Sequence, residues 1–198
     1  DVCISGSGPA GMSLALKLAE KGRRVLLLEA GGLTFTETSN NVYKGSNTGL
    51  DYFPSHASRQ RFFGGTSNHW GGWCPSLGEH DFKQREYAPH SGWPIKKRDL
   101  DPYSAETASI LDAETPHVPD YLQLDGNDPN LKKIDFSYST PVTRFGTKYR
   151  KTIESSDTIT CVLNANIVDI NLDENAASVS SLVVSNYNGS TFEARAHH

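Results

Sequence analysis

The first 32 residues alternate between short apolar runs and one amphipathic segment. The apolar runs at residues 2–4 and 25–28 have the length and composition of buried strands. Between them, residues 12–21 place leucine and alanine at helical spacing and end before Gly22, a residue that commonly terminates helices. This order predicts a strand, a helix and a second strand, which is the start of a βαβ unit.

The middle of the chain has a less regular pattern. Residues 33–98 are rich in Gly, Ser, Asn, Thr and aromatic residues, and so long an irregular stretch in a compact domain is usually functional. Residues 99–150 begin with a predicted helix from Asp99 to Leu111, capped near Asp99 or Asp101, with Pro102 in its first turn. A Pro- and Asp-rich loop is predicted to follow this helix.

The last stretch, residues 151–198, contains four strand-like runs, at residues 159–163, 167–172, 179–185 and 191–194. Asn188-Gly189 separates the last two runs. This dipeptide favours a type I′ hairpin turn, because both central residues of such a turn need a positive φ. The pattern predicts a β-meander at this end of the chain.

Composition and charge argue against several classes of protein. The 198 residues carry a net charge of −4, are 36% hydrophobic and contain no block of like charge, so neither a nucleic-acid surface nor a polybasic membrane patch is indicated. No apolar run approaches the ~20 residues of a transmembrane helix. The three cysteines are far apart and the histidines lack metal-ligand spacing, so we expect neither a disulfide framework nor a metal site.

Three glycines follow the first predicted strand with the spacing of a dinucleotide-binding turn. Gly6, Gly8 and Gly11 form G-x-G-x-x-G between a strand and a helix, the context that this motif requires. They allow a sharp turn, a close approach to a pyrophosphate and tight helix packing, and the helix N-terminus faces the phosphates. Glu29 ends the second strand, where its carboxylate can accept hydrogen bonds from ribose hydroxyls and disfavours the 2′-phosphate of NADP.

A second glycine-rich segment spans residues 61–72, with the sequence Arg-Phe-Phe-Gly-Gly-Thr-Ser-Asn-His-Trp-Gly-Gly. A glycine pair followed by small hydroxyl residues can bring bare backbone amides against a flat or anionic ligand. We therefore expect the loop at 64–69 and the turn at 6–11 to converge on one dinucleotide.

The two glycine loops resemble those of the glucose-methanol-choline oxidoreductase superfamily. Residues 6–11 with 28–32 are similar to its first FAD loop, and residues 64–67 match its G-G-[TS]-S segment, which lies along the pyrophosphate and flavin. The resemblance implies FAD as the cofactor. The FAD-binding residues that it implies are Gly6, Ser7, Gly8, Pro9, Ala10, Gly11, Glu29, Ala30, Gly64, Gly65, Thr66, Ser67, Asn68, His69, Trp70, Gly71, Ala165 and Ile167.

The pair His69-Trp70 makes the second loop look most like the sugar- and polyol-oxidising branch, which includes pyranose oxidase-like and gluconate or fructose dehydrogenase-like flavoproteins. In pyranose oxidases the histidine of this motif is linked to the flavin 8α carbon, and the resemblance carries that position to His69. Gly71 and Gly72 depart from the pattern, because pyranose oxidases place small polar residues there. A covalent bond at His69, a noncovalent contact and a structural role all remain open.

Two later segments resemble the same branch. Residues 92–103 are similar to its W-P-[IL]-x-x-x-D-L-x-P-Y segment, which implies a connection that closes over the flavin domain and begins a helix. Residues 164–168 and the hairpin after them resemble the third Rossmann strand and β-meander of the superfamily. By this resemblance, the backbone near Ile167 meets the adenine edge.

We therefore predict an α/β fold, a Rossmann-like FAD-binding domain with a parallel sheet and a β-meander. Residues 1–198 would form the amino-terminal portion of that domain: the dinucleotide motif at 1–32, a flavin-covering region at 33–98, a helix and loop at 99–150, and the third strand and meander at 151–198. The substrate domain would be largely missing.

The predicted activity is FAD-dependent oxidation of a CH–OH group on a sugar, glycoside or polyol, with hydride transfer to flavin N5. No catalytic residue is assigned, because the resemblance places the catalytic histidine in a carboxy-terminal half. We expect these residues alone to be inactive, and a second chain could supply that half. An NAD-dependent dehydrogenase and a noncatalytic nucleotide-binding fragment or split subunit remain as alternatives.

Overall fold

The computed structural model describes residues 1–114 and 136–198, which divide into two compact units. The first unit comprises residues 1–70 and 144–198, and the second comprises residues 71–143. Each unit has sheets of its own. That the whole chain is one FAD-binding domain stays a prediction. The Pro- and Asp-rich loop predicted after the helix lies mainly outside the described residues.

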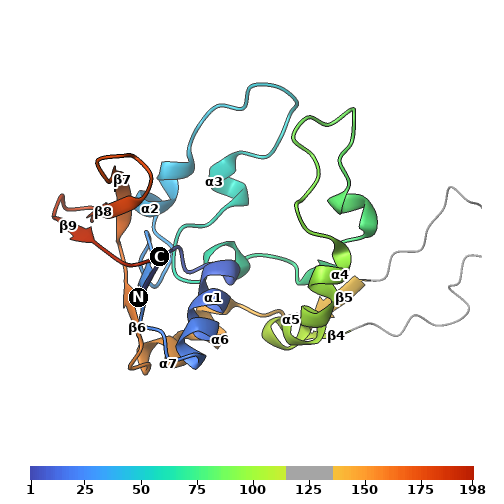
Figure 1. Cartoon of the computed structure of the whole chain (residues 1–198), viewed down its shortest axis with the longest axis horizontal. Coiled ribbons are helices and arrows are strands. Elements are labelled where there is room, and N and C mark those ends of the chain that lie inside the picture. The colour runs from blue at the N-terminus through green and yellow to red at the C-terminus, as the bar shows by residue number, and fades with distance from the viewer. Residues whose placement is uncertain (115–135) are drawn as a thin grey trace, which may run out of the picture. The chain divides into compact units, whose positions relative to one another are not determined.

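A parallel sheet forms the centre of the first unit (Figure 1). It contains β1 (Val2–Ser5), β2 (Val25–Leu28) and β6 (Ile159–Val162), in the order β1-β2-β6. Helix α1 (Pro9–Glu20) connects β1 to β2. The predicted strand, helix and second strand are therefore confirmed, with a third parallel strand from the far end of the chain beside them.

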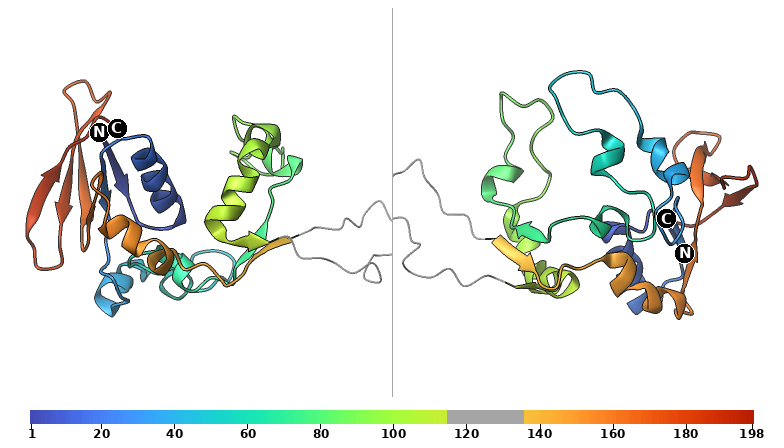
Figure 2. Two further views of the ribbon diagram at one scale, coloured as in Figure 1. Left: turned by 90° about the horizontal axis from the view of Figure 1, so that it is seen from below. Right: turned by 180° about the vertical axis from the view of Figure 1, so that it is seen from behind.

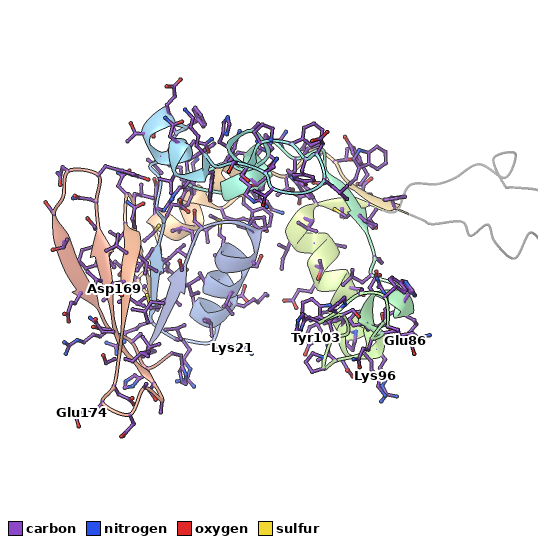
Figure 3. The ribbon with its side chains drawn as sticks, turned by 90° about the horizontal axis from the view of Figure 1, so that it is seen from above. Lys21, Glu86, Lys96, Tyr103, Asp169 and Glu174 are labelled. Carbon is purple, nitrogen blue, oxygen red and sulfur yellow. The ribbon has the colours of Figure 1, made fainter. Side chains whose placement is uncertain are left out.

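Helix α1 begins earlier than the apolar spacing predicts. Pro9 occupies its first turn, where the fixed φ of proline suits a helix start and its missing N–H is no loss. The helix ends before Gly22, whose φ of +71° ends the helix while its N–H donates to Ala19 O at 2.8 Å. Lys21, labelled in Figure 3, lies at this end.

The two faces of the parallel sheet are covered by different elements. Ile4 and Leu27 are partners in the register, and Ile4 lies against the helix side, where α1 buries Met12 and Ala15. Leu28 faces the opposite side in a buried cluster with Ala165, Val184 and Ala194. Figure 2 shows α1 and the last three strands on opposite sides of this sheet.

Those last strands form the predicted meander: β7 (Asn166–Leu172), β8 (Val179–Ser185) and β9 (Thr191–Ala194) pair antiparallel in chain order. Figure 3 labels Asp169 in β7 and Glu174 in the connection that follows. The turn type predicted between β8 and β9 is wrong. Of the pair Asn188 and Gly189, only the glycine has a positive φ, because the loop spans five residues rather than the two of a type I′ hairpin.

The rest of the first unit contains short helices. Three precede the second glycine loop in sequence, η2 lies within that loop, and α6 and α7 follow directly after the second unit. These helices are α2 (Glu37–Asn40), η1 (Asn41–Tyr43), α3 (Ser55–Ser58), η2 (Gly65–Asn68), α6 (Phe145–Lys148) and α7 (Arg150–Glu154).

The second unit has an antiparallel sheet in the order β3-β5-β4, formed by β3 (Trp73–Pro75), β5 (Phe136–Ser139) and β4 (Ala113–Glu114). Its helical elements are η3 (Glu79–Phe82), α4 (Lys97–Leu100), η4 (Asp101–Tyr103) and α5 (Ser104–Leu111). Figure 3 labels Lys96, which precedes α4, and Tyr103, the last residue of η4.

The single helix predicted from Asp99 to Leu111 is wrong in two respects. It begins at Lys97, where Asp99 accepts a hydrogen bond from the N–H of Lys96, and a 3₁₀ turn interrupts it at 101–103. Pro102 lies within that turn, because proline has no N–H for a continuous α-helix. No helix in the described ranges is long and apolar enough to cross a membrane.

Candidate dinucleotide-binding site

A cavity of about 460 Å³ opens in the first unit where the two glycine loops approach the ends of β2 and the start of β7. Half of the residues predicted to bind the cofactor line it: Gly6, Gly8, Pro9, Glu29, Ala30, Gly65, Thr66, Ala165 and Ile167. Five lining residues were not predicted: Ser5, Leu28, Tyr43, Gln60 and Arg61. The volume lies in the range of small-molecule and cofactor sites.

The first glycine turn presents bare backbone to this cavity. Gly6 has a φ of +91°, which favours glycine, and its N–H donates to Leu28 O at 2.7 Å. A Cβ on Gly6 or on Gly8 would meet no atom within 4 Å. Among the described residues, no side chain caps the start of α1, so its first amides stay open to an anion.

Ser7 does not line the cavity but is fully buried behind it. Its N–H and its hydroxyl both donate to Glu29 Oε2, at 2.9 and 2.6 Å, and the N–H of Gly31 donates to Oε1 at 2.8 Å. A carboxylate offers about four acceptor positions, so three are occupied within the protein. The sequence assigned Glu29 to ribose binding, and the structure gives its carboxylate this internal contact as well.

The two glycine loops meet at Ser7. The N–H of Gly64 donates to Ser7 Oγ at 3.1 Å, and both groups are buried. A Cβ on Gly65 would lie 3.1 Å from Gly8 Cα, so the two backbones pass each other in contact. The structure thus brings together the turn at 6–11 and the loop at 64–69, as the glycine pattern indicates.

Residues 144–146 anchor the second glycine loop through hydrogen bonds and close backbone packing. Arg144 Nη1 donates to Ser67 O at 2.9 Å and to Trp70 O at 2.7 Å, and the N–H of Phe145 donates to Ser67 Oγ at 3.2 Å. A Cβ on Gly146 would lie 2.4 Å from Phe63 O. The sequence analysis missed this anchor, because no local motif marks residues whose partners lie more than seventy positions away.

The other half of the residues predicted to bind the cofactor lies outside the cavity lining. Gly11 packs against the first turn, since a Cβ there would lie 2.0 Å from Gly6 O, and Asn68 Nδ2 donates to Phe63 O and Gly65 O within its own loop. His69 is exposed, and its ring has no hydrogen-bond partner in the described ranges. Residues outside the cavity lining are Ser7, Ala10, Gly11, Gly64, Ser67, Asn68, His69, Trp70 and Gly71, of which Gly71 belongs to the second unit.

Cys161 of β6 lies outside the lining of the dinucleotide cavity and is a thiol without the properties of a nucleophile. Burial, and secondarily the charge of Glu29, raise the pKa of Cys161 to about 11. The thiol is therefore protonated at neutral pH. Across residues 1–114 and 136–198, no group of three His, Cys, Asp or Glu side chains could hold a metal ion.

Comparison with known proteins matches residues 1–126 to the family described as FAD dependent oxidoreductase (DAO). No curated protein matches the chain. Among solved structures, a mutant formate oxidase of Aspergillus oryzae RIB40 is 17% identical with a TM-score of 0.58, covering 100% of this chain and 44% of that one.

A pyridoxine 4-oxidase from Mesorbium loti is 19% identical with a TM-score of 0.54, covering 98% of this chain and 47% of that one. The chain therefore spans less than half the length of both structures. The matches confirm the predicted fold class, an α/β FAD-binding domain with a parallel sheet, and they confirm FAD as the cofactor.

Proposed function

Because the chain belongs to the family of FAD-dependent oxidoreductases, we propose that it forms the cofactor-binding part of a glucose-methanol-choline type enzyme that oxidises a CH–OH group of a sugar, glycoside or polyol. The observation that carries the proposal is the meeting of two glycine loops at one cavity, through Ser7 and Gly64. When bound, FAD accepts the hydride equivalent that leaves the substrate carbon.

The lining of the cavity fits a dinucleotide. Bare backbone at Gly6 and Gly8 leaves room for a pyrophosphate, and the uncapped start of α1 supplies amides and a favourable dipole. Glu29 retains about one acceptor position for a ribose hydroxyl. Ala165 and Ile167 offer a small apolar surface for the adenine edge.

We assign the flavin end of the site to the second glycine loop. Gly65 and Thr66 line the cavity, and the loop continues to the exposed His69. An exposed imidazole with no hydrogen-bond partner among the described residues is free to contact a flavin or to form a bond with it.

The sugar or polyol substrate rests on the likeness of His69-Trp70 to the sugar-oxidising branch. The two similar structures carry the names of enzymes for formate and pyridoxine, so a substrate panel has to include both compounds. No described residue is proposed as the catalytic base. The activity is accordingly a proposal for the complete enzyme.

An absorbance spectrum before and after acid precipitation tests the cofactor part of the proposal. Yellow colour in the supernatant means noncovalent FAD, and yellow colour in the pellet means covalent attachment. His69→Ala should move the colour from the pellet to the supernatant if the bond is at His69. A full-length protein that purifies without flavin and takes up none from added FAD would contradict the proposal.

Anaerobic bleaching of the flavin tests the substrate part. We expect sugars or polyols to reduce the flavin of the complete enzyme, whereas formate and pyridoxine should not. Residues 1–198 alone should give no bleaching, and addition of a second chain that carries the remaining residues should restore it. Bleaching by formate or pyridoxine but by no sugar or polyol would overturn the substrate assignment and leave the FAD assignment intact.

A further inference from the structure

Arg61 is the one cationic side chain among the described residues that line the dinucleotide cavity. The same lining contains the carboxylate of Glu29, and the ligand proposed for the cavity brings an anionic diphosphate. Buried or half-buried charges of one sign are costly unless an opposite charge lies nearby. The cavity therefore needs a cation, and Arg61 is placed to supply it.

The guanidinium of Arg61 is held in position by two groups from distant parts of the chain. Its Nη2 donates to Asn166 Oδ1 at 2.9 Å, and its Cζ lies 5.8 Å from the centre of the Tyr43 ring. The Asn166 amide is itself oriented, because its Nδ2 donates to Ser185 O at 3.1 Å. The side chain is thus fixed before any ligand binds, which lowers the entropy cost of binding.

The backbone of Arg61 is fixed as firmly as its side chain. Its N–H donates to Asn40 Oδ1 at 3.2 Å, and its carbonyl accepts the hydroxyl of Ser39 at 2.9 Å. A Cβ on Gly31 would lie 2.1 Å from that carbonyl oxygen, so the segment after β2 passes directly against residue 61. Arg61 is consequently placed beside the end of β2, where Glu29 lies.

Within the described part of the chain, the hydrogen bond to Asn166 uses one of the five N–H donors of this guanidinium. The planar guanidinium group has further N–H donors in a fixed arrangement, and this arrangement matches the oxygens of a phosphate better than the ammonium group of a lysine does. We propose that Arg61 binds the diphosphate in the ADP half of FAD, and that Asn166 and Tyr43 position it. This inference rests on the proposed function, because it assumes that the cavity holds FAD.

The experiment measures binding of FAD, ADP and adenosine to the flavin-free full-length enzyme by titration calorimetry, for the parent and for four variants. Arg61→Gln removes the charge, and Arg61→Lys keeps the charge without the planar arrangement of donors. Asn166→Ala removes the positioning contact. Arg59→Gln is the matched control, since Arg59 is a neighbouring, exposed arginine outside the cavity lining.

We expect Arg61→Gln to weaken both FAD and ADP by roughly ten- to hundredfold and to leave adenosine unchanged, since a hydrogen bond to a charged group contributes about 1.5–3 kcal/mol. Arg61→Lys should recover part of the ADP affinity, and Asn166→Ala should weaken ADP by several-fold with adenosine unchanged. The salt dependence of ADP binding should fall in Arg61→Gln and stay the same in Arg59→Gln.

Equal ADP affinity in the parent and in Arg61→Gln would overturn the inference. So would an equal loss of ADP and adenosine, since that result would place the contact at the nucleoside rather than at the diphosphate. If the parent enzyme binds no FAD at all, the proposed function itself fails. A parent that binds FAD while Arg61→Gln binds it equally well contradicts this inference alone.

Discussion

The hydroxyl of Ser7 lies 2.6 Å from Glu29 Oε2, and both side chains are buried, Glu29 in the lining of the dinucleotide cavity and Ser7 outside that lining. The same hydroxyl oxygen accepts the N–H of Gly64. One serine side chain therefore links the turn after β1, the end of β2 and the second glycine loop. Because these contacts exist within the protein alone, the two loops are held in place before FAD binds.

Replacement of Ser7 by alanine should destabilise the protein and weaken FAD binding. Ser7→Ala removes a hydrogen bond to a carboxylate and leaves the buried N–H of Gly64 without its acceptor, which together should cost about 2–4 kcal/mol. Urea unfolding measures the loss. Ser13→Ala in α1 is the control, because Ser13 makes no side-chain hydrogen bond in the described ranges. Equal unfolding midpoints for both variants would disprove this role of Ser7.

Structural features that depend on residues close together in the sequence could be predicted from the sequence. The apolar run at 25–28, the glycine turn at 6–11 and the meander strands each depend on local periodicity or on backbone freedom, and each was found in its expected place. The meeting of the two glycine loops was also expected, since both loops suit the same ligand. The type of turn at Asn188 and Gly189 was not predicted correctly, because this dipeptide alone does not fix the length of the loop around it.

Features that depend on contacts between distant residues could not be predicted. Arg144 holds the second glycine loop from a position that no motif marks, and the side chain of Arg61 contacts Asn166 and Tyr43, which are distant in sequence. The extra contact of Glu29 with Ser7 was missed for the same reason. The position of an acid at the end of a strand indicates ribose binding, but it does not reveal how many of its acceptor positions the protein itself uses.

Replacement by alanine should have different effects at two glycines of the first turn, with FAD affinity reduced at Gly8 and stability reduced at Gly11. A Cβ on Gly8 would meet no protein atom within 4 Å, so Gly8→Ala should keep its stability within about 0.5 kcal/mol. FAD affinity should fall at least about tenfold, because Gly8 lines the cavity and a methyl group there takes space from the ligand. A Cβ on Gly11 would lie 2.0 Å from Gly6 O, so Gly11→Ala should lose about 2–3 kcal/mol of stability.

Urea unfolding and FAD titration of these two variants separate the predictions. The informative comparison is the loss of stability against the loss of FAD affinity in each variant. A general disturbance of the turn would reduce stability and affinity together in both variants. If Gly8→Ala binds FAD as tightly as the parent, the first turn does not contact the cofactor.

Loss of Arg144 should loosen the second glycine loop without touching the cavity lining. Arg144→Gln removes two charge-assisted hydrogen bonds to backbone carbonyls, at a cost of about 2–4 kcal/mol. Hydrogen exchange should speed up at the amides of residues 65–70, and FAD should dissociate faster. Arg150→Gln is the matched control, because Arg150 forms an exposed pair with Glu154 that contributes little. Unchanged exchange in this loop would contradict the anchoring role.

The thiol of Cys161 should make the stability of the protein fall at alkaline pH. Its pKa is raised from 9.0 to about 11 in the folded state, first by burial and then by the charge of Glu29. Well below pH 9 the thiol is protonated in both states and contributes no pH dependence. Between pH 9 and 11 the unfolded chain loses this proton while the folded protein keeps it, so the free energy of unfolding decreases as pH rises.

Cys161→Ala should therefore show a shallower decline in stability than the parent between pH 9 and 11, although the lost volume of the thiol group lowers its stability at every pH. Urea unfolding at pH 8, 9, 10 and 11 measures both curves, and their difference isolates Cys161 from the lysines and tyrosines that titrate in the same range. Because the thiol is half-buried, the difference should be smaller than its full pKa shift implies. Parallel curves for parent and variant would show that Cys161 titrates alike in both states, and the proximity of Glu29 to this thiol would then have no effect on folding.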